Sequence, residues 1–435
     1  MNEGGNAGLE GSAVRGPPLD SSQLARVTKS RIAPAVVLGT GFNGLSFLRS
    51  LGRRGIPTIA MDTWRDAAAF SRYGAFLEVP DPAVGEAALL ALLERIAQRI
   101  PRRGVLIPTS DAFAMFVSQF EADLAAHYDL NVPDHKTVLT VTDKKLQYKH
   151  AAKVGVAAPL SLFPEESDIR VIAKEVSYPC VLKPCLAHRW RRYLQTTGTP
   201  GGRKAIEIRS AGELIDAYET MKVSGVEFMV QEKIPGGDDR LWALQTYLDR
   251  SHAPKAVFTK CKLRQYPRGF GDSCFQIGRW DAQVAETGLR LLQTLSYRGN
   301  AGVEFKRDPR DDRLKLVEAN PRSLATNHHA VVSGVDIPYI TYRDSRGEKV
   351  EEPSSFQDGI KWVDLTRDLQ SFLQYRNSRE LSAGQWLRSL RGRRCHARFT
   401  WDDPLPAVVG LARFSRNHGL RALADLRRRP TASAV

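Results

Sequence analysis

The first strongly patterned stretch of the chain, residues 35–62, alternates apolar runs with a glycine-rich turn. It reads "AVVLGTGFNGLSFLRSLGRRGIPTIAMD": an unbroken apolar run, a segment with apolar residues at helical spacing, and a second apolar run that ends at Asp62. This order predicts a buried strand, a helix and a second buried strand, the opening of a parallel sheet. "GVLIPTSDAF" (104–113) predicts another strand, with residues 109–111 at the carboxyl end, where open parallel sheets bind ligands.

From about residue 140, the pattern of polar and apolar residues differs from that of the front part of the chain. "TDKKLQYKHAAKVGVAAP" (142–159) predicts a helix with a Thr or Asp cap. "YPCVLKP" (178–184) predicts a strand with Lys183 near its end, and "EFMVQEKIPGGDD" (227–239) predicts a strand that runs into a turn and two acids. The basic, glycine-rich stretch at about 187–204 fits either a mobile cover over phosphates or a plain surface loop.

A β-hairpin is predicted for residues 299–322. In "GNAGVEFKRDPRDDRLKLVEANPR" the turn-forming stretch "DPRDD" separates two apolar, β-prone runs. Strict alternation along the second run places Leu316, Glu318 and Asn320 on one face of the strand. If the loop is centred on the fourth residue of "DPRDD", Glu304 lies opposite Glu318 across the ladder.

Two opposed glutamates require a compensating cation. Directly opposed carboxylates roughly 5 Å apart repel by about 3 kcal/mol at an effective dielectric near 20. The carboxylates of Glu304 and Glu318 and the amide oxygen of Asn320 form a hard, all-oxygen set that suits Mg²⁺ or Mn²⁺ together with the phosphates of a nucleotide. The alternative is that Lys306 or Arg322 neutralises the pair.

Composition narrows the functional classes. The 435 residues are 42% hydrophobic, which is enough for two to four domains with real cores. The sequence has no apolar stretch of membrane-spanning length and no signal-peptide pattern, so we expect a cytoplasmic protein. Its five cysteines lack a CxxC pair, which argues against a disulfide framework or a zinc site.

The formal net charge of +15 predicts an anionic partner. Twelve arginines against four acids lie between Arg379 and Arg429, but aromatic residues are not interleaved with them, so nucleic acid is disfavoured. In "LPAVVGLARFSRNHGLRALADLRRRP" (405–430) apolar residues recur at helical intervals between arginines. We expect this helix either to lie on an anionic membrane surface or to dock on its own protein.

A glycine motif near the N-terminus raises one functional hypothesis. Gly39, Gly41 and Gly44 form G-x-G-x-x-G, and Asp62 lies where a dinucleotide fold has its ribose-binding acid. An NAD(P)-dependent oxidoreductase is therefore one candidate. The motif alone is weak evidence, because such glycines are also needed for close packing of a strand against a helix.

Five motifs in order favour a different class. "TDK", "YPCVLKP", "MVQEKIPGG", "GVEFK" and "VEANPR" together resemble the ATP-grasp superfamily, in particular the carboxylate-amine ligases of its D-aspartate ligase-like branch. The resemblance covers about residues 35–345 and implies an α/β fold with a Rossmann-like front domain before the ATP-grasp domain. The expected organisation is, in order, a disordered leader (1–30), a Rossmann-like pre-ATP-grasp domain (31–140), an ATP-grasp domain (141–345) made of a small lid (about 150–230) and a larger α/β part, and a basic C-terminal segment (346–435).

The resemblance also implies roles for particular residues. These are, by role, phosphate-binding Lys144 and Lys183; adenine-binding Gln231 with the backbone of Glu232 and Ile234; ribose-binding Asp238 or Asp239; magnesium ligands Glu304, Glu318 and Asn320; and, around the γ-phosphate or a substrate carboxylate, Arg322, Lys262 and Arg264. Lys262 and Arg264 are expected to share one strand face by alternation. For either phosphate-binding lysine alone, for the two strand cations and for the two aspartates, an ordinary solvated position is the alternative.

The reaction that the resemblance implies is the ATP-dependent joining of a carboxylate and an amine. The acid is activated as an acyl phosphate, the amine attacks it to form an amide, and ADP and phosphate are released. The expected partners are a small-molecule acid and amine, with an amino acid or peptide as the usual class. The competing hypotheses are the NAD(P)-dependent oxidoreductase and a non-catalytic nucleotide-binding scaffold.

Overall fold

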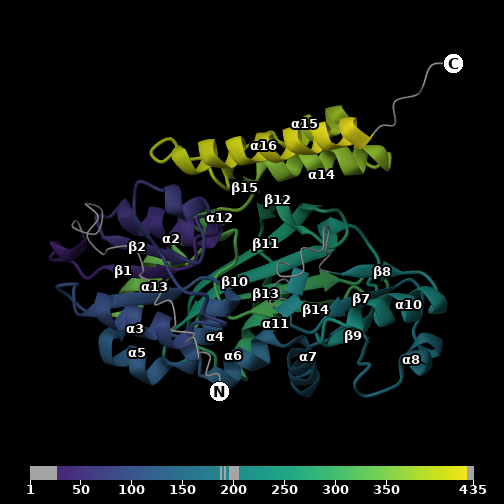
Figure 1. The fold of residues 1–435 in the computed structure, drawn as a ribbon, viewed down its shortest axis with the longest axis horizontal. Coiled ribbons are helices and arrows are strands. Elements are labelled where there is room, and N and C mark those ends of the chain that lie inside the picture. Colours follow the sequence, from purple (N-terminus) through teal and green to yellow (C-terminus); the bar gives the residue numbers. More distant parts are fainter. Residues whose placement is uncertain (1–26, 187–188, 191–192, 195–204, 429–435) are drawn as a thin grey trace, which may run out of the picture.

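The computed structural model describes residues 27–186, 189–190, 193–194 and 205–428 (Figure 1). Most of the expected leader and most of the glycine-rich stretch at 187–204 lie outside these residues. Within the described part the chain has a mixed α/β architecture built on a five-stranded, a four-stranded and a seven-stranded sheet.

The five-stranded sheet is parallel, with its strands in the order β3-β2-β1-β4-β5. Its elements are β1 (Ala35–Leu38), α2 (Phe42–Gly52), β2 (Thr58–Asp62), η1 (Ala67–Phe70), β3 (Ala75–Glu78), α3 (Glu86–Ala97), β4 (Gly104–Pro108), α4 (Asp111–Gln119), α5 (Glu121–His127) and β5 (Tyr128–Asp129). Residues 35–38 pair in parallel with both 58–61 and 105–108. The strand–helix–strand prediction for 35–62 and the strand predicted within 104–113 are therefore confirmed.

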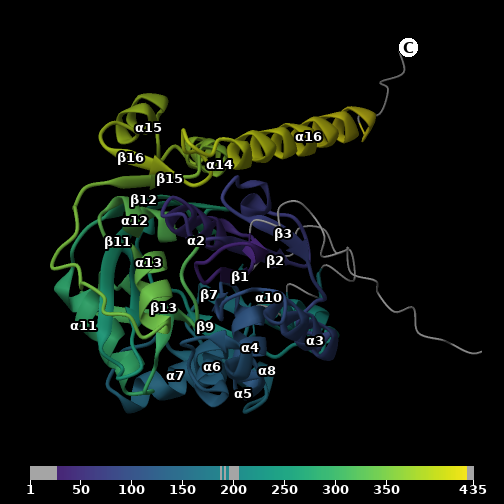
Figure 2. The same ribbon diagram turned by 90° about the vertical axis from the view of Figure 1, so that its left-hand side faces the viewer.

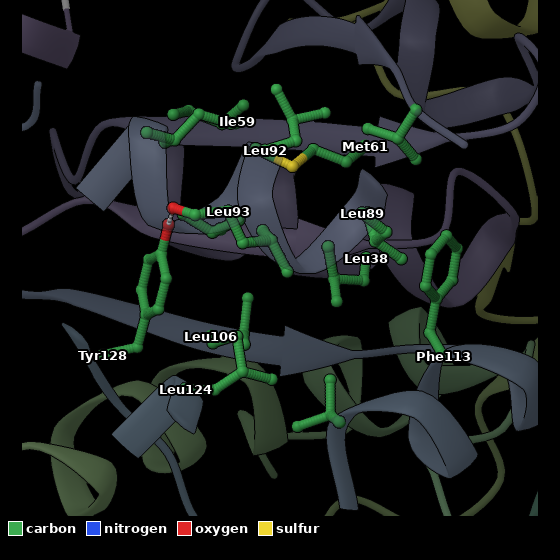
Figure 3. Close-up of a cluster of buried hydrophobic side chains, with 14 of the residues drawn as sticks. Leu38, Ile59, Met61, Leu89, Leu92, Leu93, Leu106, Phe113, Leu124 and Tyr128 are labelled. Atoms are coloured by element: carbon green, nitrogen blue, oxygen red, sulfur yellow. Dashed lines mark hydrogen bonds between the residues drawn. The ribbon is translucent and has the colours of Figure 1, made fainter. Parts of the chain in front are cut away.

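One face of this sheet is closed by a core of aliphatic and aromatic side chains (Figure 3). Leu38, Ile59 and Leu106 of the sheet meet the leucines of α3, and the Tyr128 hydroxyl donates a hydrogen bond to the carbonyl of Leu93 at 2.6 Å. The apolar runs are continuous because both faces of a parallel sheet are covered. This packing fixes the carboxyl ends of β1 and β4 side by side.

The four-stranded sheet is antiparallel and has the order β6-β9-β7-β8. It follows helices α6 (His135–Thr142) and α7 (Lys144–Lys153) in the chain. Its elements are β6 (Ser161–Leu162), α8 (Ile169–Glu175), β7 (Cys180–Pro184), β8 (Ile206–Ile208), α10 (Ala211–Lys222) and β9 (Phe228–Glu232). Apolar residues of α8 and α10 pack on this sheet and give it a core of its own.

The seven-stranded sheet has the order β14-β13-β10-β11-β12-β15-β16 and is antiparallel except for the last pair. Its elements are η2 (Asp238–Arg240), β10 (Leu241–Leu248), β11 (Pro254–Tyr266), β12 (Asp272–Gly278), α11 (Ala282–Gln293), β13 (Gly299–Arg307), β14 (Leu314–Asn320), α12 (Asn327–Val332), α13 (Ile337–Ser345), β15 (Lys361–Val363) and β16 (Arg394–His396). Residues of α11 pack with Leu244 on one face, and residues of α12 and α13 pack with Phe258 on the other.

The C-terminal part is built into the fold rather than appended to it. β15 and β16 extend the large sheet, and a layer of helices lies beyond them: α14 (Leu365–Asn377), α15 (Ala383–Ser389) and α16 (Leu405–Arg428). Figures 1 and 2 both show these helices together on one side of the molecule. Among the described helices, none combines the length and apolarity that a bilayer-spanning helix needs.

Candidate nucleotide and metal site

The β13–β14 hairpin sets Glu304 directly opposite Glu318. Gly302 pairs with Asn320 two positions further on, so the two carboxylates and the amide lie on one face of the hairpin. The predicted register of the glutamates is confirmed. Within the described part of the chain, the carboxylate of Glu304 makes no direct hydrogen bond or salt bridge.

The alternation predicted for β14 is wrong at Leu316. The register shifts next to Glu304, where Phe305 pairs with Leu316 and Val317 is the extra residue of a β-bulge. Leu316 and Ala319 both join the apolar core on the other face of the sheet. Because a bulge inserts one residue into one strand, it reverses the faces of the residues on its two sides. The strand can therefore bury Leu316 in the core while its polar end faces the site.

Lys144 provides the positive charge that lies closest to the glutamates. It is the first residue of α7, whose N-cap Asp143 accepts hydrogen bonds from the next turn, and its Nζ donates to Oε1 of Glu318 at 3.0 Å. Burial opposes the charge of this lysine, but the carboxylate of Glu318 outweighs burial and raises the pKa of Lys144 above its ordinary value. The expected alternative, neutralisation by Lys306 or Arg322, is wrong for Lys306, which donates instead to the carbonyl of Ile234 at 2.9 Å.

Lys183 lies close to Lys144 at the end of β7. Its Nζ donates to the hydroxyl of Tyr148 at 3.1 Å, and that hydroxyl donates to the carbonyl of Val317 at 2.8 Å. Burial, reinforced by the charge of Lys144, lowers the pKa of Lys183 to about 7. Sequence reasoning missed Tyr148, although its position one helical turn after Lys144 places both side chains on one face of α7. The structure thus brings both predicted phosphate-binding lysines to the glutamate pair.

The three predicted adenine-binding residues lie at the end of β9 and directly after it, next to the short strand β6. The amide of Gln231 donates to Oγ of Ser161 at 2.7 Å. The backbone N–H of Glu232 donates to the carbonyl of Leu160 at 2.9 Å, so the prediction that this backbone meets a base is wrong for its N–H group. Ile234 is buried, and its carbonyl accepts from Lys306.

The side chain of Glu232 forms salt bridges instead. It pairs with Lys315 at 2.5 Å and with Arg310 at 2.9 Å, and Lys315 also pairs with the buried Asp308. Burial works against this carboxylate, but the two cations lower the pKa of Glu232. These ion pairs tie the end of β9 to the β13–β14 hairpin and its turn.

Asp238 and Asp239 form the turn of η2 that enters the large sheet. Oδ1 of Asp238 accepts from the amide of Gln265 at 2.6 Å, and its other oxygen accepts from the Tyr375 hydroxyl of α14. The side chain of Asp239 is exposed. Of the two, Asp239 has the carboxylate that a ribose can approach without breaking a hydrogen bond.

Lys262 and Arg264 do not share a strand face as alternation predicted. The β11–β12 pairing shifts between them, and Arg264 forms a buried ion pair with Asp368 of α14 at 2.7 Å. Its guanidinium also lies over the ring of Phe275. The assignment of Arg264 to the γ-phosphate is therefore corrected to a structural role, because breaking this pair would leave an unpaired charge in the protein interior.

Lys260 is a site residue that sequence reasoning missed. Ala243 pairs with both Lys260 and Glu304, so these two side chains lie on one face of the sheet two strands apart. Lys260 is buried and donates to the amide oxygen of Gln245 at 2.5 Å. Burial lowers its pKa to about 7 against the attraction of Glu304. Lys262 follows on the same face by alternation, nearer the surface.

Arg322 connects the β13–β14 hairpin to the carboxyl edge of the front sheet. Its Nε donates to Asp111 at 2.6 Å, a second nitrogen reaches the other oxygen of the same carboxylate, and the amide oxygen of Asn320 accepts from it at 3.1 Å. Burial opposes the charge, but Asp111 raises the pKa of Arg322. The amide of Asn43, in the first turn of α2, donates to the carbonyl of Ser323 at 3.2 Å. The front sheet therefore frames this site.

The glycines of the G-x-G-x-x-G motif have a structural role in this protein. Gly39 has φ +114°, and a Cβ on Gly44 would lie 2.1 Å from the carbonyl oxygen of Gly39, so both positions exclude larger residues. Both oxygens of Asp62 are engaged: one accepts from the N–H and hydroxyl of Thr40 in the glycine turn, and the other accepts from the N–H of Thr63. A ribose-binding acid needs a free carboxylate, so the NAD(P) hypothesis is disfavoured.

The residues present fit a divalent cation. Glu304 and Glu318 are in register, Asn320 is next to them, and all donors are oxygen atoms, which suits Mg²⁺. No group of three or more His, Cys, Asp or Glu side chains placed to hold a metal occurs among the described residues. Mg²⁺ keeps open positions for water and phosphate in such sites.

Comparison with known proteins gives one curated relative and many solved structures. No family model matches the chain. D-aspartate ligase of Enterococcus faecium (strain Aus0004) is 24% identical over 326 residues, which cover 71% of this chain and 76% of the relative.

The structural neighbours have low sequence identity but cover most of both chains. N5-carboxyaminoimidazole ribonucleotide synthetase in complex with ADP has a TM-score of 0.60 at 14% identity, covering 80% of this chain and 86% of that one. Biotin carboxylase of Campylobacter jejuni has a TM-score of 0.56 at 16% identity, covering 75% and 74%. L-amino acid ligase of Bacillus licheniformis has a TM-score of 0.55 at 12% identity, covering 73% and 75%. These likenesses confirm, at the level of the fold, the resemblance given by the five sequence motifs.

Proposed function

We propose that this chain, whose fold is that of the ATP-grasp superfamily, is an ATP-dependent carboxylate-amine ligase. The observation that carries the proposal is the convergence of Lys144, Lys183 and Arg322 on the opposed pair Glu304 and Glu318. Positive charge and metal-binding oxygens around one face are what phosphoryl transfer requires, since positioning and electrostatics supply most of its catalysis.

The relatives support a ligation between small molecules. The curated relative is a D-aspartate ligase and one neighbour is an L-amino acid ligase, so an amino acid is the substrate class that we infer for the acid or the amine. Two other neighbours were solved with ADP or an ATP analogue. Mg-ATP bound at the hairpin would supply the phosphoryl group that activates the acid.

The position of each residue in the site indicates its role in this reaction. The carboxylates of Glu304 and Glu318 and the amide of Asn320 would hold the metal. Lys144 neutralises Glu318 in the present structure, and its ammonium is free to turn toward phosphate when metal neutralises the carboxylates. Arg322 is held in place by Asp111 and presents a fixed, permanently charged group to a phosphate or a substrate carboxylate.

We infer that the five-stranded sheet is the Rossmann-like pre-ATP-grasp domain. Its strand order, β3-β2-β1-β4-β5, is that of the first part of a doubly wound sheet, and the order reverses between β1 and β4. Ligands bind at such a switch point, and here Asp111 follows β4 and meets Arg322. These contacts support a binding position for the acid substrate between the front sheet and the hairpin. The small sheet of β6 to β9 is then the lid.

A screen for phosphate release tests the proposed reaction. The full chain is incubated with ATP, Mg²⁺ and pairs of amino acids, and free phosphate, ADP and AMP are measured. We expect a productive pair to release ADP and phosphate only when acid and amine are both present, because the amine must consume the activated acid. AMP as the product would overturn the acyl-phosphate route. ATP binding with no turnover across the panel would favour the scaffold alternative.

Lys183 gives a prediction for proton uptake. Its pKa of about 7 in the free protein means that it is mainly neutral at pH 8 and mainly protonated at pH 6. Its charged neighbours are Lys144 and Glu318, and the phosphates of a nucleotide add negative charge, which raises the pKa. We expect ATP binding to take up a proton at pH 8 and none at pH 6, and to weaken as pH rises through 7.

Calorimetry in two buffers of different ionisation enthalpy measures this uptake. The control is Lys183→Met, which retains the length of the side chain and removes the titrating group. Lys260 has a similar pKa, so Lys260→Met separates its contribution. Equal uptake in wild type and Lys183→Met would show that another group titrates.

A further inference from the structure

The outermost helices leave a stripe of leucines in solvent. On α14, Leu365, Leu369 and Leu373 recur every four residues and are 48%, 40% and 48% exposed. The adjacent face of this helix buries Asp368 and Phe372 against the protein. When one face of a helix packs on the protein and an apolar stripe stays in solvent, that stripe marks a surface for a second binding partner.

The same pattern recurs on α16. Val408 and Leu411 are 58% and 57% exposed, whereas Val409 and Phe414 line a cavity of about 200 Å³ against η1 and α14. The inner side of α16 thus packs on the protein, which agrees with the expectation that this helix docks on its own chain. Its outer apolar side has no partner among the described residues.

These side chains belong to one layer of the molecule. Helices α14, α15 and α16 lie on the same side in both views (Figures 1 and 2). We call the exposed large apolar residues of these helices, together with Trp401 in the turn before α16, the C-terminal face: Leu365, Leu369, Leu373, Leu387, Trp401, Leu405, Val408 and Leu411. Trp401 is 90% exposed, and tryptophan is the residue type that prefers the boundary between water and lipid.

Positive charge surrounds this face. The exposed arginines of the same layer are Arg376, Arg379, Arg388, Arg391, Arg393, Arg394 and Arg416. Two of the four acids between residues 365 and 416, Asp368 and Asp403, are buried in ion pairs with Arg264 and Arg49. A second copy of the chain would bring arginines against arginines, whereas an anionic lipid surface matches both the apolar residues and the charge.

We propose that the C-terminal face docks this protein on an anionic membrane surface. The proposal is independent of the ligase function, because the face lies on the side of the large sheet marked by β15 and β16, at the opposite end of the strand order from the Glu304–Glu318 hairpin. Leucines, valine and tryptophan would enter the headgroup region, and arginines would pair with lipid phosphates.

Vesicle flotation of the full chain tests this proposal. Vesicles of phosphatidylcholine alone are compared with vesicles that also contain phosphatidylglycerol. We expect the protein to float with the anionic vesicles only, and to be released by high salt. Val408→Asp with Leu411→Asp should weaken binding at least about ten-fold, because both changes put charge on the apolar side. Arg393→Gln should weaken it about five-fold.

The matched control is Val84→Asp, a valine of similar exposure in the front part of the chain, at 66% against 58% for Val408. It should leave flotation unchanged, and ATP binding by every variant checks the fold. Absence of flotation with either vesicle overturns the proposal, as does equal binding to neutral vesicles. A concentration-dependent dimer that Val408→Asp dissociates would assign the face to a second copy instead.

Discussion

Replacing Glu318 with glutamine should reduce ADP formation by at least about 10³-fold. A metal ion contributes several kcal/mol of charge stabilisation in phosphoryl transfer, and about 1.4 kcal/mol corresponds to a factor of ten. The glutamine keeps an oxygen that can accept from Nζ of Lys144, so the fold around α7 should survive. The measurement is ADP formation with a productive substrate pair, together with a Mg²⁺ titration of ATP binding.

Two further variants test whether the loss of activity is specific to the opposed carboxylates. Glu304→Gln removes the opposed carboxylate and should have a loss of similar size, because the two carboxylates lie in register and would hold the same ion. Glu175→Gln, on an exposed position of α8, is the matched control and should retain activity. If Glu318→Gln keeps activity within about threefold of wild type, the hairpin does not bind the catalytic metal, and Lys144 and Glu318 are an ordinary salt bridge.

Asp403→Asn should lower the free energy of unfolding by about 3–5 kcal/mol. Asp403 and Arg49 are each 1% exposed and form an ion pair at 2.9 Å, and Asp403 also accepts from the Ser71 hydroxyl and the N–H of Arg72. Removing one partner of a buried ion pair leaves the other charge uncompensated, and this change usually lowers the free energy of unfolding by about 3–5 kcal/mol. For a chain of this length the change corresponds to a fall of roughly 3–6 °C in the thermal midpoint, which circular dichroism can follow.

The neighbouring Asp402→Asn is the matched control for this variant. Asp402 pairs with Arg53 at 2.7 Å, but the two side chains are 40% and 32% exposed, so water screens the interaction. We expect a loss of about 1 kcal/mol or less. Equal effects of the two substitutions would mean that burial of the Arg49 pair does not decide stability. Arg49 lies on α2, behind the glycine loop, so the same pair ties the C-terminal segment to the part of the fold that frames the site.

Local sequence patterns were sufficient to predict the helices and strands whose apolar residues recur at a fixed spacing. The front strands, the hairpin and the opposition of Glu304 and Glu318 follow from apolar periodicity and turn chemistry, both of which act over a few residues. The order of the five motifs predicted the fold, which the solved neighbours confirm. The roles of the individual residues remain predictions, since none of the comparisons tests them.

Alternation failed at Leu316 and at Arg264 for a common reason. At both places the ladder register shifts, so the residue beside the shift faces the side that strict alternation does not predict. A shift of this kind is chosen by what the strand must bury: the apolar core for Leu316 and the ion pair with Asp368 for Arg264. These partners lie on other elements, so no window along the strand contains them.

The sequence by itself determined the succession of strands and helices, the hairpin register at the glutamates and the excess of arginine near the C-terminus. Only the tertiary structure decided that Lys144 neutralises Glu318, that Arg322 is held by Asp111, and that Asp403 reaches Arg49. The physical reason is the distance along the chain over which each interaction acts. Periodicity records which side of an element is apolar, whereas a buried charge is stable only beside a partner that folding brings from a distant part of the chain.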